Sequence, residues 1–171
     1  MREIDKILLP DKPVWWMSIQ ERAMVVGIAA ILQPDIILEV GIYKGGCTHQ
    51  LAKMAKRVIC IDPVNNLDMP LPANCTYLQT TSDVYFEQHK NETYDLIVVD
   101  ADHSTESAYK DLMNSIQCGR VVLMHDTMND TCRAGYQQAI DSAVLRYSNL
   151  EMVHGNVHDG VMWGGIGLCI R

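Results

Sequence analysis

The sequence contains neither a long hydrophobic segment nor a run of basic residues. No stretch approaches the roughly 20 consecutive apolar residues that cross a bilayer, and the apolar part of the N-terminal sequence MREIDKILLPDKP is too short for the core of a signal peptide. The formal net charge of −7 disfavours binding to the phosphate backbone of nucleic acids. We therefore expect a cytoplasmic protein that binds neither membranes nor nucleic acid.

Closely spaced cysteine pairs are also missing, and phenylalanine occurs only once. The six cysteines have no C-x-x-C spacing, which is typical of buried thiols in a reducing compartment rather than of disulfides or a zinc site. Ten methionines and a hydrophobic fraction of 48% indicate an aliphatic, globular core. A chain of 171 residues is expected to form one domain, which buries about 70% of its unfolded surface.

Short apolar segments alternate along the chain with segments of helical periodicity. Ser18 and Glu21 form a capping-box pattern, and apolar residues follow at helical spacing to about Leu32, before Pro34. Further helices are expected at about residues 48–55, after Ser82, and at about 104–117 and 131–146. Strands are expected at Ile36–Val40, Val58–Ile61, Thr76–Leu78, Leu96–Val99, Val121–Met124, Leu150–His154 and Gly165–Ile170.

The pattern of these strands predicts the fold class. They are continuously rather than alternately apolar, as in a parallel sheet that helices cover on both faces. We predict a doubly wound α/β fold in a single domain of residues 1–171, with an N-terminal segment and helix at 1–34 and the core at 35–171. In such folds the ligand binds beyond the carboxyl ends of the strands, where the strand order reverses.

The segment Ile36–Thr48, IILEVGIYKGGCT, indicates which ligand binds there. A strand, a glycine loop and a helix start follow one another, as in nucleotide-binding folds. A dinucleotide fingerprint needs a second glycine where this chain has Tyr43, and Glu39 would repel a pyrophosphate but attract an amine. S-adenosylmethionine, which carries an adenosine and an amino acid, is therefore expected rather than NAD, and an NAD-linked oxidoreductase is disfavoured.

Acidic and imidazole residues gather where the predicted strands end, which is where such a fold binds its ligand. They are Glu39, Asp62, Asp100, Asp102, His103, His125 and Asp126.

Four motifs resemble those of class I S-adenosylmethionine-dependent methyltransferases: LEVGIYKGGCT, VICIDP, YDLIVVDADHSTESAYKDL and GRVVLMHDT. The last two resemble the small metal-dependent O-methyltransferases of the catechol, caffeoyl-CoA and natural-product sugar types. The resemblance extends from about Ser18 to the C-terminus. It implies a Rossmann-like, mostly parallel seven-stranded sheet whose final strand pair is antiparallel.

The resemblance and the spacing together suggest which residues bind the cofactor. Asp62 lies 21 residues after Gly41, close to the offset of an acid that binds ribose hydroxyls, although it could also serve the turn before Pro63. Ser82 matches an adenine-contacting position but could instead cap a helix. The expected cofactor-binding residues are Glu39, Gly41, Tyr43, Gly45, Gly46, Asp62, Ser82 and Asp100.

By matching position, the metal ligands implied by the resemblance are Asp100, His125 and Asp126. Such groups shift one another's pKa values strongly unless a cation lies between them. Related enzymes carry an acid where this chain has His125, and an imidazole ligand favours Mn²⁺ or another transition metal over Mg²⁺. A metal-free polar rim, in which His125 only forms hydrogen bonds, is the alternative.

Two residues between the strand near 96–99 and the next helix are candidate general bases, His103 and Asp102. We rank His103 first because imidazole titrates near neutral pH. Asp102 could instead cap the helix, and His103 could be a solvated loop residue.

The expected reaction is O-methylation of a small-molecule hydroxyl with S-adenosylmethionine, assisted by Mg²⁺ or another divalent metal. A metal-independent methyltransferase and a non-catalytic S-adenosylmethionine-binding module remain alternatives, and a homodimer remains open. Trp15 and Trp16 could cover the site or pack the N-terminal segment.

Overall fold

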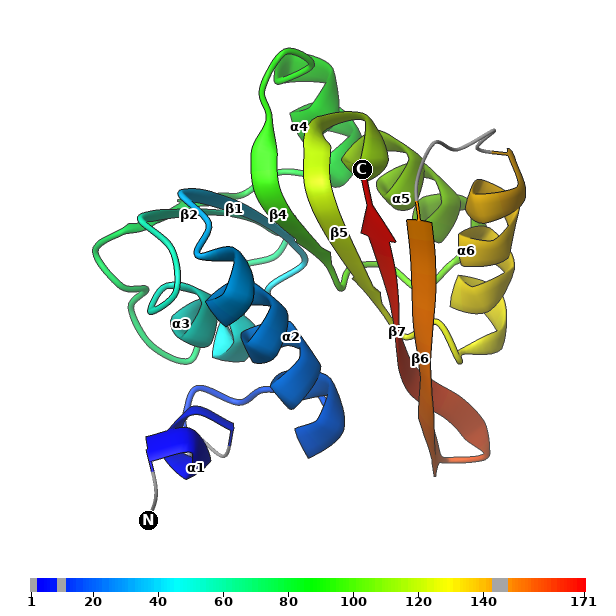
Figure 1. Ribbon diagram of the computed structural model, residues 1–171, viewed down its shortest axis with the longest axis horizontal. Helices are drawn as coiled ribbons and strands as arrows, with labels where there is room; N and C mark the ends of the chain where they lie inside the picture. The colour runs from blue at the N-terminus through cyan, green and yellow to red at the C-terminus, as the bar shows by residue number, and fades with distance from the viewer. Residues whose placement is uncertain (1–2, 9–11, 143–147) are drawn as a thin grey trace.

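The computed structural model describes residues 3–8, 12–142 and 148–171 (Figure 1). Its strands are β1 Ile36–Val40, β2 Arg57–Ile61, β3 Cys75–Leu78, β4 Tyr94–Val99, β5 Gly119–His125, β6 Ser148–His158 and β7 Val161–Ile170. The helices are α1 Glu3–Leu8, α2 Ile19–Leu32, α3 Gly46–Leu51, α4 Ser82–Gln88, α5 Thr105–Cys118 and α6 Asp130–Ser142.

The seven strands form one sheet in the order β3-β2-β1-β4-β5-β7-β6. The strands from β3 to β5 are parallel, whereas β7 pairs antiparallel with both β5 and β6. The chain moves outward from β1 through β2 to β3 and then returns to place β4 on the other side of β1. The predicted Rossmann-like fold is confirmed, and its switch point lies between β1 and β4.

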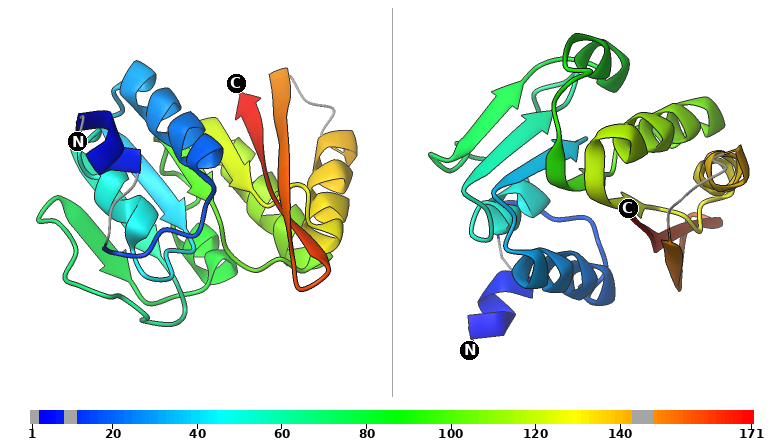
Figure 2. Two further views of the ribbon diagram at one scale, coloured as in Figure 1. Left: turned by 90° about the horizontal axis from the view of Figure 1, so that it is seen from below. Right: turned by 45° about the horizontal axis from the view of Figure 1, so that its top comes forward.

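Helices cover both faces of the sheet (Figure 2). Leu38 of β1 belongs to a buried cluster that contains residues of α4, α5 and α6. The preceding residue, Ile37, belongs to a second buried cluster with residues of α2 and α3. Because successive side chains of a strand point to opposite faces, each central strand feeds both clusters. This two-sided burial explains why the strands are continuously apolar.

The beginning of α2 agrees with its sequence pattern. The Ser18 side chain accepts a hydrogen bond from the backbone N–H of Glu21, and the Glu21 side chain accepts one from the backbone of Ser18. The helix ends at Leu32, and the capping residue Gln33 that follows has a left-handed conformation with φ 46°. The capping box therefore defines the start of α2, as the sequence predicted.

Some predicted boundaries differ from the structure, and one lies outside the residues that it describes. The helix expected at about 48–55 is α3, which begins within the glycine loop at Gly46 and ends at Leu51. The expected end of α6 near residue 146 lies outside the described residues, which end there at Ser142. The final two strands are longer than predicted because they continue to a turn at Asp159 and Gly160, both with positive φ.

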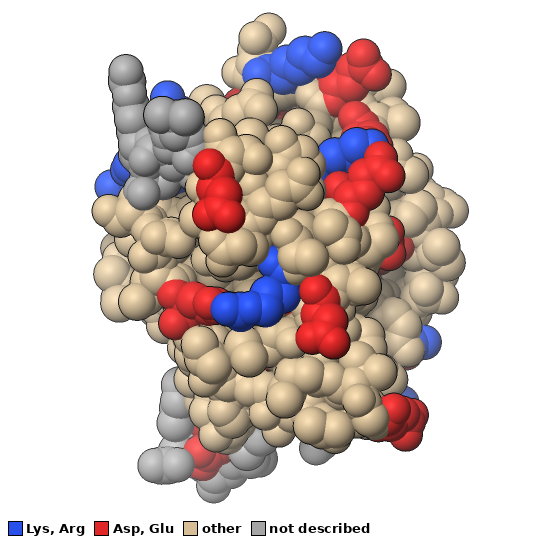
Figure 3. Space-filling view, turned by 90° about the vertical axis from the view of Figure 1, so that its right-hand side faces the viewer, with Lys and Arg blue, Asp and Glu red and all other residues tan. Residues whose placement is uncertain are grey.

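Strand β6 forms one edge of the sheet. Its side chains Leu150, Val153 and Val157 are exposed. Figure 3 views the side of the molecule that carries α6 and this hairpin, where acidic and basic side chains lie interspersed among uncharged ones.

Within the described residues, none of the helices combines the length and the apolar character needed to span a bilayer. The homodimer stays a prediction.

Candidate active site

The glycine loop follows β1 at the switch point of the sheet. The backbone N–H of Asp100 donates to the carbonyl oxygen of Val40 at 2.8 Å, so the ends of β4 and β1 lie side by side. A Cβ atom at Gly41 would lie 2.1 Å from the carbonyl oxygen of Asp100, and Gly41 has φ +82°. Glycine at this position therefore allows the two strand ends to approach each other.

Gly46 makes room for the N-terminal segment. A Cβ atom there would lie 2.2 Å from the carbonyl oxygen of Val14 and 2.5 Å from Cβ of Trp15. Trp15 is buried, and the Arg22 guanidinium lies 5.3 Å from the centre of its ring. A side chain at Gly46 would therefore collide with the N-terminal segment, and its role in binding the cofactor stays a prediction. The packing alternative for Trp15 is the one that the structure shows.

Tyr43 lies at the outer side of the loop. It has φ 45° and is 46% exposed. Its ring centre lies 5.6 Å from that of Trp16, which is 73% exposed. Gly45 has φ +83° and precedes the first turn of α3. The loop therefore presents an aromatic pair to solvent rather than the open backbone that a pyrophosphate requires.

Asp62, at the end of β2, holds the glycine loop in place. Its Oδ2 accepts hydrogen bonds from the backbone N–H groups of Ile42 at 3.0 Å and Tyr43 at 3.1 Å. Its Oδ1 accepts one from the N–H of Val64 at 2.9 Å. Asp62 thus serves the turn before Pro63 as well as the loop, and Oδ1, which accepts only one of these bonds, retains a lone pair for a ribose hydroxyl.

Glu39 is the predicted anionic group at the end of β1, but it is only 1% exposed. Burial raises its pKa to about 8, despite the opposing contacts of Thr48 and Cys47. Its Oε2 atom is buried and has no hydrogen-bond partner. A carboxyl with this raised pKa is largely protonated at neutral pH, and a cation beside it would favour the carboxylate. The negative charge expected at the end of β1 stays a prediction.

Ser82 is the first residue of α4, the helix that follows β3. The residue that caps α4 is Thr81, whose side chain accepts from the N–H of Val84 at 3.4 Å. The capping alternative for Ser82 is therefore wrong. Its side chain instead contacts the buried Asp111 of α5.

The three predicted metal ligands come together at the ends of β4 and β5. Nδ1 of His125 lies 3.1 Å from Oδ1 of Asp100 and 3.3 Å from Oδ2 of Asp126. One possible ligand atom from each residue lies within 4.8 Å of the other two. Asp126 has φ 57°, and its Oδ1 accepts from the N–H of Gly164 at 2.6 Å. That bond leaves Oδ2 facing His125.

This donor set fits a divalent cation. Adjacent ligands of an octahedral ion with bonds of about 2.1 Å lie about 3 Å apart. The separations of 3.1 and 3.3 Å around Nδ1 of His125 have this size. Two carboxylates with one imidazole suit Mn²⁺ or a similar transition metal better than Mg²⁺.

His103 adjoins the same cluster from the loop after β4. Its Nε2 lies 2.8 Å from Oδ2 of Asp126, and its ring packs edge-on against Trp163, with centres 5.2 Å apart. The contact with Asp126 raises the pKa of His103, although burial opposes this. His103 therefore adjoins the candidate metal site, although its side chain is 36% exposed, and its role as general base stays a prediction.

Asp102 is turned toward the start of α5. Ser104 is the residue that caps α5, and its hydroxyl donates to Oδ2 of Asp102 at 2.7 Å. This bond, together with Ser107, lowers the pKa of Asp102 below its ordinary value. A carboxylate with a lowered pKa is a weak base, so Asp102 is a poorer candidate for the general base than His103. The capping alternative for Asp102 is wrong, because Ser104 caps α5.

Sequence reasoning missed Glu21, which is 2% exposed and faces the cluster from α2. Its Oε1 lies 3.3 Å from Nε2 of His125. Burial raises the pKa of Glu21, but His125 and Ser18 outweigh burial and lower it. For His125 the effects have the opposite sign. Burial lowers its pKa, but Asp100, Asp126 and Glu21 outweigh burial and raise the pKa well above its ordinary value. The capping-box pattern explained Glu21 as part of a helix start and gave no sign of its contact with His125.

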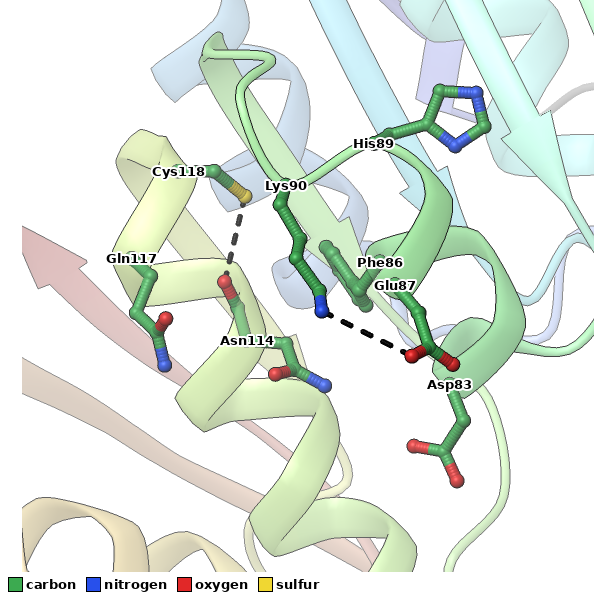
Figure 4. A pocket seen from close by; sticks show the side chains of 8 residues that line it. All are labelled: Asp83, Phe86, Glu87, His89, Lys90, Asn114, Gln117 and Cys118. Atoms are coloured by element: carbon green, nitrogen blue, oxygen red, sulfur yellow. Dashed lines mark hydrogen bonds and ion pairs between the residues drawn. The ribbon is translucent and has the colours of Figure 1, made fainter.

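A separate groove of about 290 Å³ lies between α4 and α5 (Figure 4). Its lining includes Phe86, Lys90 and Cys118. Cys118 ends α5 immediately before β5 begins, so the groove lies at the amino ends of the strands. It is therefore not part of the site at the carboxyl ends.

A sheet of this strand order, with an acid and a glycine loop ending β1, defines the class I S-adenosylmethionine-dependent methyltransferases. The chain belongs to the methyltransferase domain family, whose model matches residues 38–127, or 90 of the 171 residues. A comparison with curated protein sequences found no match.

Solved methyltransferases share the fold. An O-methyltransferase from Bacillus cereus in complex with S-adenosylhomocysteine superposes with a TM-score of 0.71 at 18% identity, over 95% of this chain and 84% of that one. The O-methyltransferase TomG from Streptomyces achromogenes, in complex with S-adenosylmethionine and involved in tomaymycin synthesis, gives 0.69 at 13% identity, over 95% and 83%. The predicted resemblance is thereby confirmed at the level of family and fold.

Proposed function

We propose that this methyltransferase transfers the methyl group of S-adenosylmethionine to a hydroxyl of a small molecule, with a divalent cation held by Asp100, His125 and Asp126. The observation that carries the proposal is the cluster of these three side chains within 4.8 Å of one another. It lies at the ends of β4 and β5, next to the glycine loop after β1. A cofactor at that loop and an acceptor at the cluster would be neighbours.

Different residues of the pocket would bind different parts of the cofactor. When bound, S-adenosylmethionine supplies an electrophilic methyl group, and the cation supplies a charge that lowers the pKa of an acceptor hydroxyl. Glu39 would accept the amino group of the cofactor, because its buried Oε2 lacks another partner. Oδ1 of Asp62 would accept a hydrogen bond from a ribose hydroxyl, and Ser82 and Tyr43 would border the adenosine. Together these contacts orient the methyl group toward the acceptor oxygen.

His103 is the residue that would remove the hydroxyl proton. Its ring is held on one side by Trp163, and its Nε2 faces the cluster at 2.8 Å from Asp126. Because Nε2–H would donate to the Asp126 carboxylate, Nδ1 is the nitrogen that would accept the proton from the acceptor oxygen, and Asp126 would stabilise the imidazolium that results. General base catalysis of this kind contributes about 10²–10⁴-fold to the rate.

A metal-independent methyltransferase is the second candidate. His125 lies against Asp100, Asp126 and Glu21, and these groups raise its pKa well above the ordinary value. An imidazolium at this position would neutralise part of the carboxylate charge without a metal ion. His103 would then act alone on the hydroxyl.

Incubation with labelled S-adenosylmethionine and a panel of catechols, sugar diols and small acids tests both candidates. We expect methyl transfer to a hydroxyl that is stimulated by Mn²⁺ or Mg²⁺ and abolished by EDTA. Transfer that EDTA leaves unchanged would favour the metal-independent enzyme. Absence of transfer to any hydroxyl, together with transfer to nitrogen or carbon acceptors in a wider panel, would contradict O-methylation.

A further inference from the structure

Glu21 joins three parts of the chain that are distant in sequence. Its Oε2 accepts a hydrogen bond from the backbone N–H of Ser18 at 2.6 Å, within the first turn of α2. Its Oε1 accepts one from the N–H of Gly165 in β7 at 2.8 Å. The same Oε1 lies 3.3 Å from Nε2 of His125, at the end of β5. Both oxygens are thus committed, and the side chain has little freedom to turn.

The two nitrogens of His125 face different partners. Nδ1 faces Asp100 and Asp126, which are the other two candidate metal ligands. Nε2 faces Glu21 from the opposite edge of the ring. A histidine binds a cation through an unprotonated nitrogen, so a ligating Nδ1 requires the proton to be on Nε2. Ligating histidines donate that second N–H to a carboxylate or carbonyl, which fixes both the tautomer and the ring orientation.

We propose that Glu21 is a positioning residue, which holds the His125 ring so that Nδ1 points at Asp100 and Asp126. The proposal rests on the metal site of the proposed function. It assigns a role to α2, which lies outside the part of the chain that the family model matches. Helix α2 is then a component of the active site and not only a cover for the sheet.

Two variants separate this role from helix capping. Glu21→Gln is isosteric and keeps a capping box, because glutamine also serves at that position. It has a single acceptor oxygen, so it cannot serve both the N–H of Ser18 and Nε2 of His125. Ser18→Ala is the matched control: it removes the hydroxyl that accepts from the N–H of Glu21 at 3.3 Å, and it leaves the carboxylate intact.

The first measurement is Mn²⁺ binding by calorimetry, with the full chain. We expect Glu21→Gln to weaken binding by about 10–100-fold, as is typical when the hydrogen-bond partner of a ligating histidine is removed. We expect Ser18→Ala to lower the melting temperature but to leave the Mn²⁺ affinity within about twofold of the wild type. Equal losses of affinity in both variants would overturn the proposal, because they would show that Glu21 acts only through the helix start.

The second measurement needs no metal. In ¹⁵N-histidine-labelled, metal-free protein, we expect a slowly exchanging Nε2–H signal of His125, assigned by its loss in His125→Gln. The signal should persist in Ser18→Ala and be lost or exchange rapidly in Glu21→Gln. Its persistence in Glu21→Gln would overturn the positioning role. If the wild type binds no Mn²⁺ but the Nε2–H signal depends on Glu21 as expected, the metal site would be contradicted. The role of Glu21 in positioning the His125 ring would still be supported.

Discussion

The surroundings of individual side chains shift their pKa values, as three residues show: Glu39, His103 and Asp111. Glu39 is buried at the end of β1, and its pKa is raised to about 8. His103 is half-buried and lies against Asp126, which raises its pKa. Asp111 is buried between α5 and the start of α4, and its pKa is raised to about 6. Each shift leads to a measurable consequence.

Cofactor binding should release a proton from Glu39. With a pKa of about 8, the carboxyl should be largely protonated at pH 7 before the cofactor binds, and a bound ammonium group would favour the carboxylate. Calorimetry with S-adenosylhomocysteine in buffers of different ionisation enthalpy should therefore show release of about one proton at pH 7, which decreases above pH 8. Glu39→Gln should abolish this release and weaken binding. A wild-type heat that does not depend on the buffer would contradict the assignment.

Replacement of His103 should impair turnover without affecting cofactor binding. Glutamine keeps a polar side chain near Asp126 but cannot accept the hydroxyl proton, so His103→Gln should lower kcat by about 10²–10⁴-fold. The affinity for S-adenosylhomocysteine should stay unchanged. The exposed His158, paired with Asp159 in the hairpin, supplies the control variant His158→Gln. Loss of both turnover and cofactor affinity in His103→Gln would place His103 in the cofactor pocket instead.

Asp111 should make the protein less stable as the pH rises. Burial and the charges of Asp83 and Asp102 raise its pKa from 3.8 to about 6. Because the folded state holds the proton more tightly, stability is lost between pH 3.8 and 6, by up to about 3 kcal/mol. Asp111→Asn should therefore be more stable than the wild type in urea at pH 8, with little difference at pH 4. An equal difference at both pH values would contradict this account.

At the scale of elements, two helical glycines have opposite surroundings. A Cβ atom at Gly27 in α2 would meet no atom within 4 Å. A Cβ atom at Gly135 in α6 would lie 2.3 Å from the carbonyl oxygen of Thr105 and 2.8 Å from Cβ of Ala108. The second glycine therefore sets the close packing of α6 against α5, whereas the first only adds conformational freedom to the unfolded chain.

The same substitution should thus have opposite effects at the two positions. Gly27→Ala should raise the free energy of unfolding by up to about 1 kcal/mol. Gly135→Ala should lower it by about 1–3 kcal/mol, because backbone atoms of α5 must move. Urea denaturation of both variants at one pH measures the two changes. A stabilising Gly135→Ala would show that the two helices are not packed as described.

Elements with strong local signals were predictable, and elements defined by distant contacts were not. The capping box of Ser18 and Glu21 predicted the start of α2, and continuous apolar runs predicted the central strands. Strand β6 was predicted too short, because many of its residues are exposed and its pairing with β7 is irregular between Met152 and Gly155. An edge strand with this pattern lacks the periodicity that marks a buried one.

At the scale of the whole molecule, the site depends on contacts that no local pattern contains. Neighbouring strand ends brought Asp100, His125 and Asp126 together as expected, because the order of parallel strands follows from the fold class. The contact from Glu21 to Gly165 spans 144 residues. No sequence window includes both ends of it, which explains why the role of Glu21 was missed.

The most direct test of the account is a crystal structure of the protein with S-adenosylhomocysteine and Mn²⁺, with anomalous scattering used to locate the metal. We predict S-adenosylhomocysteine against the glycine loop, with its amino group at Glu39, and an anomalous peak bounded by Asp100, His125 and Asp126. Density for the nucleoside elsewhere, or a cluster in which the His125 ring fills the space between the carboxylates and no peak occurs, would contradict it.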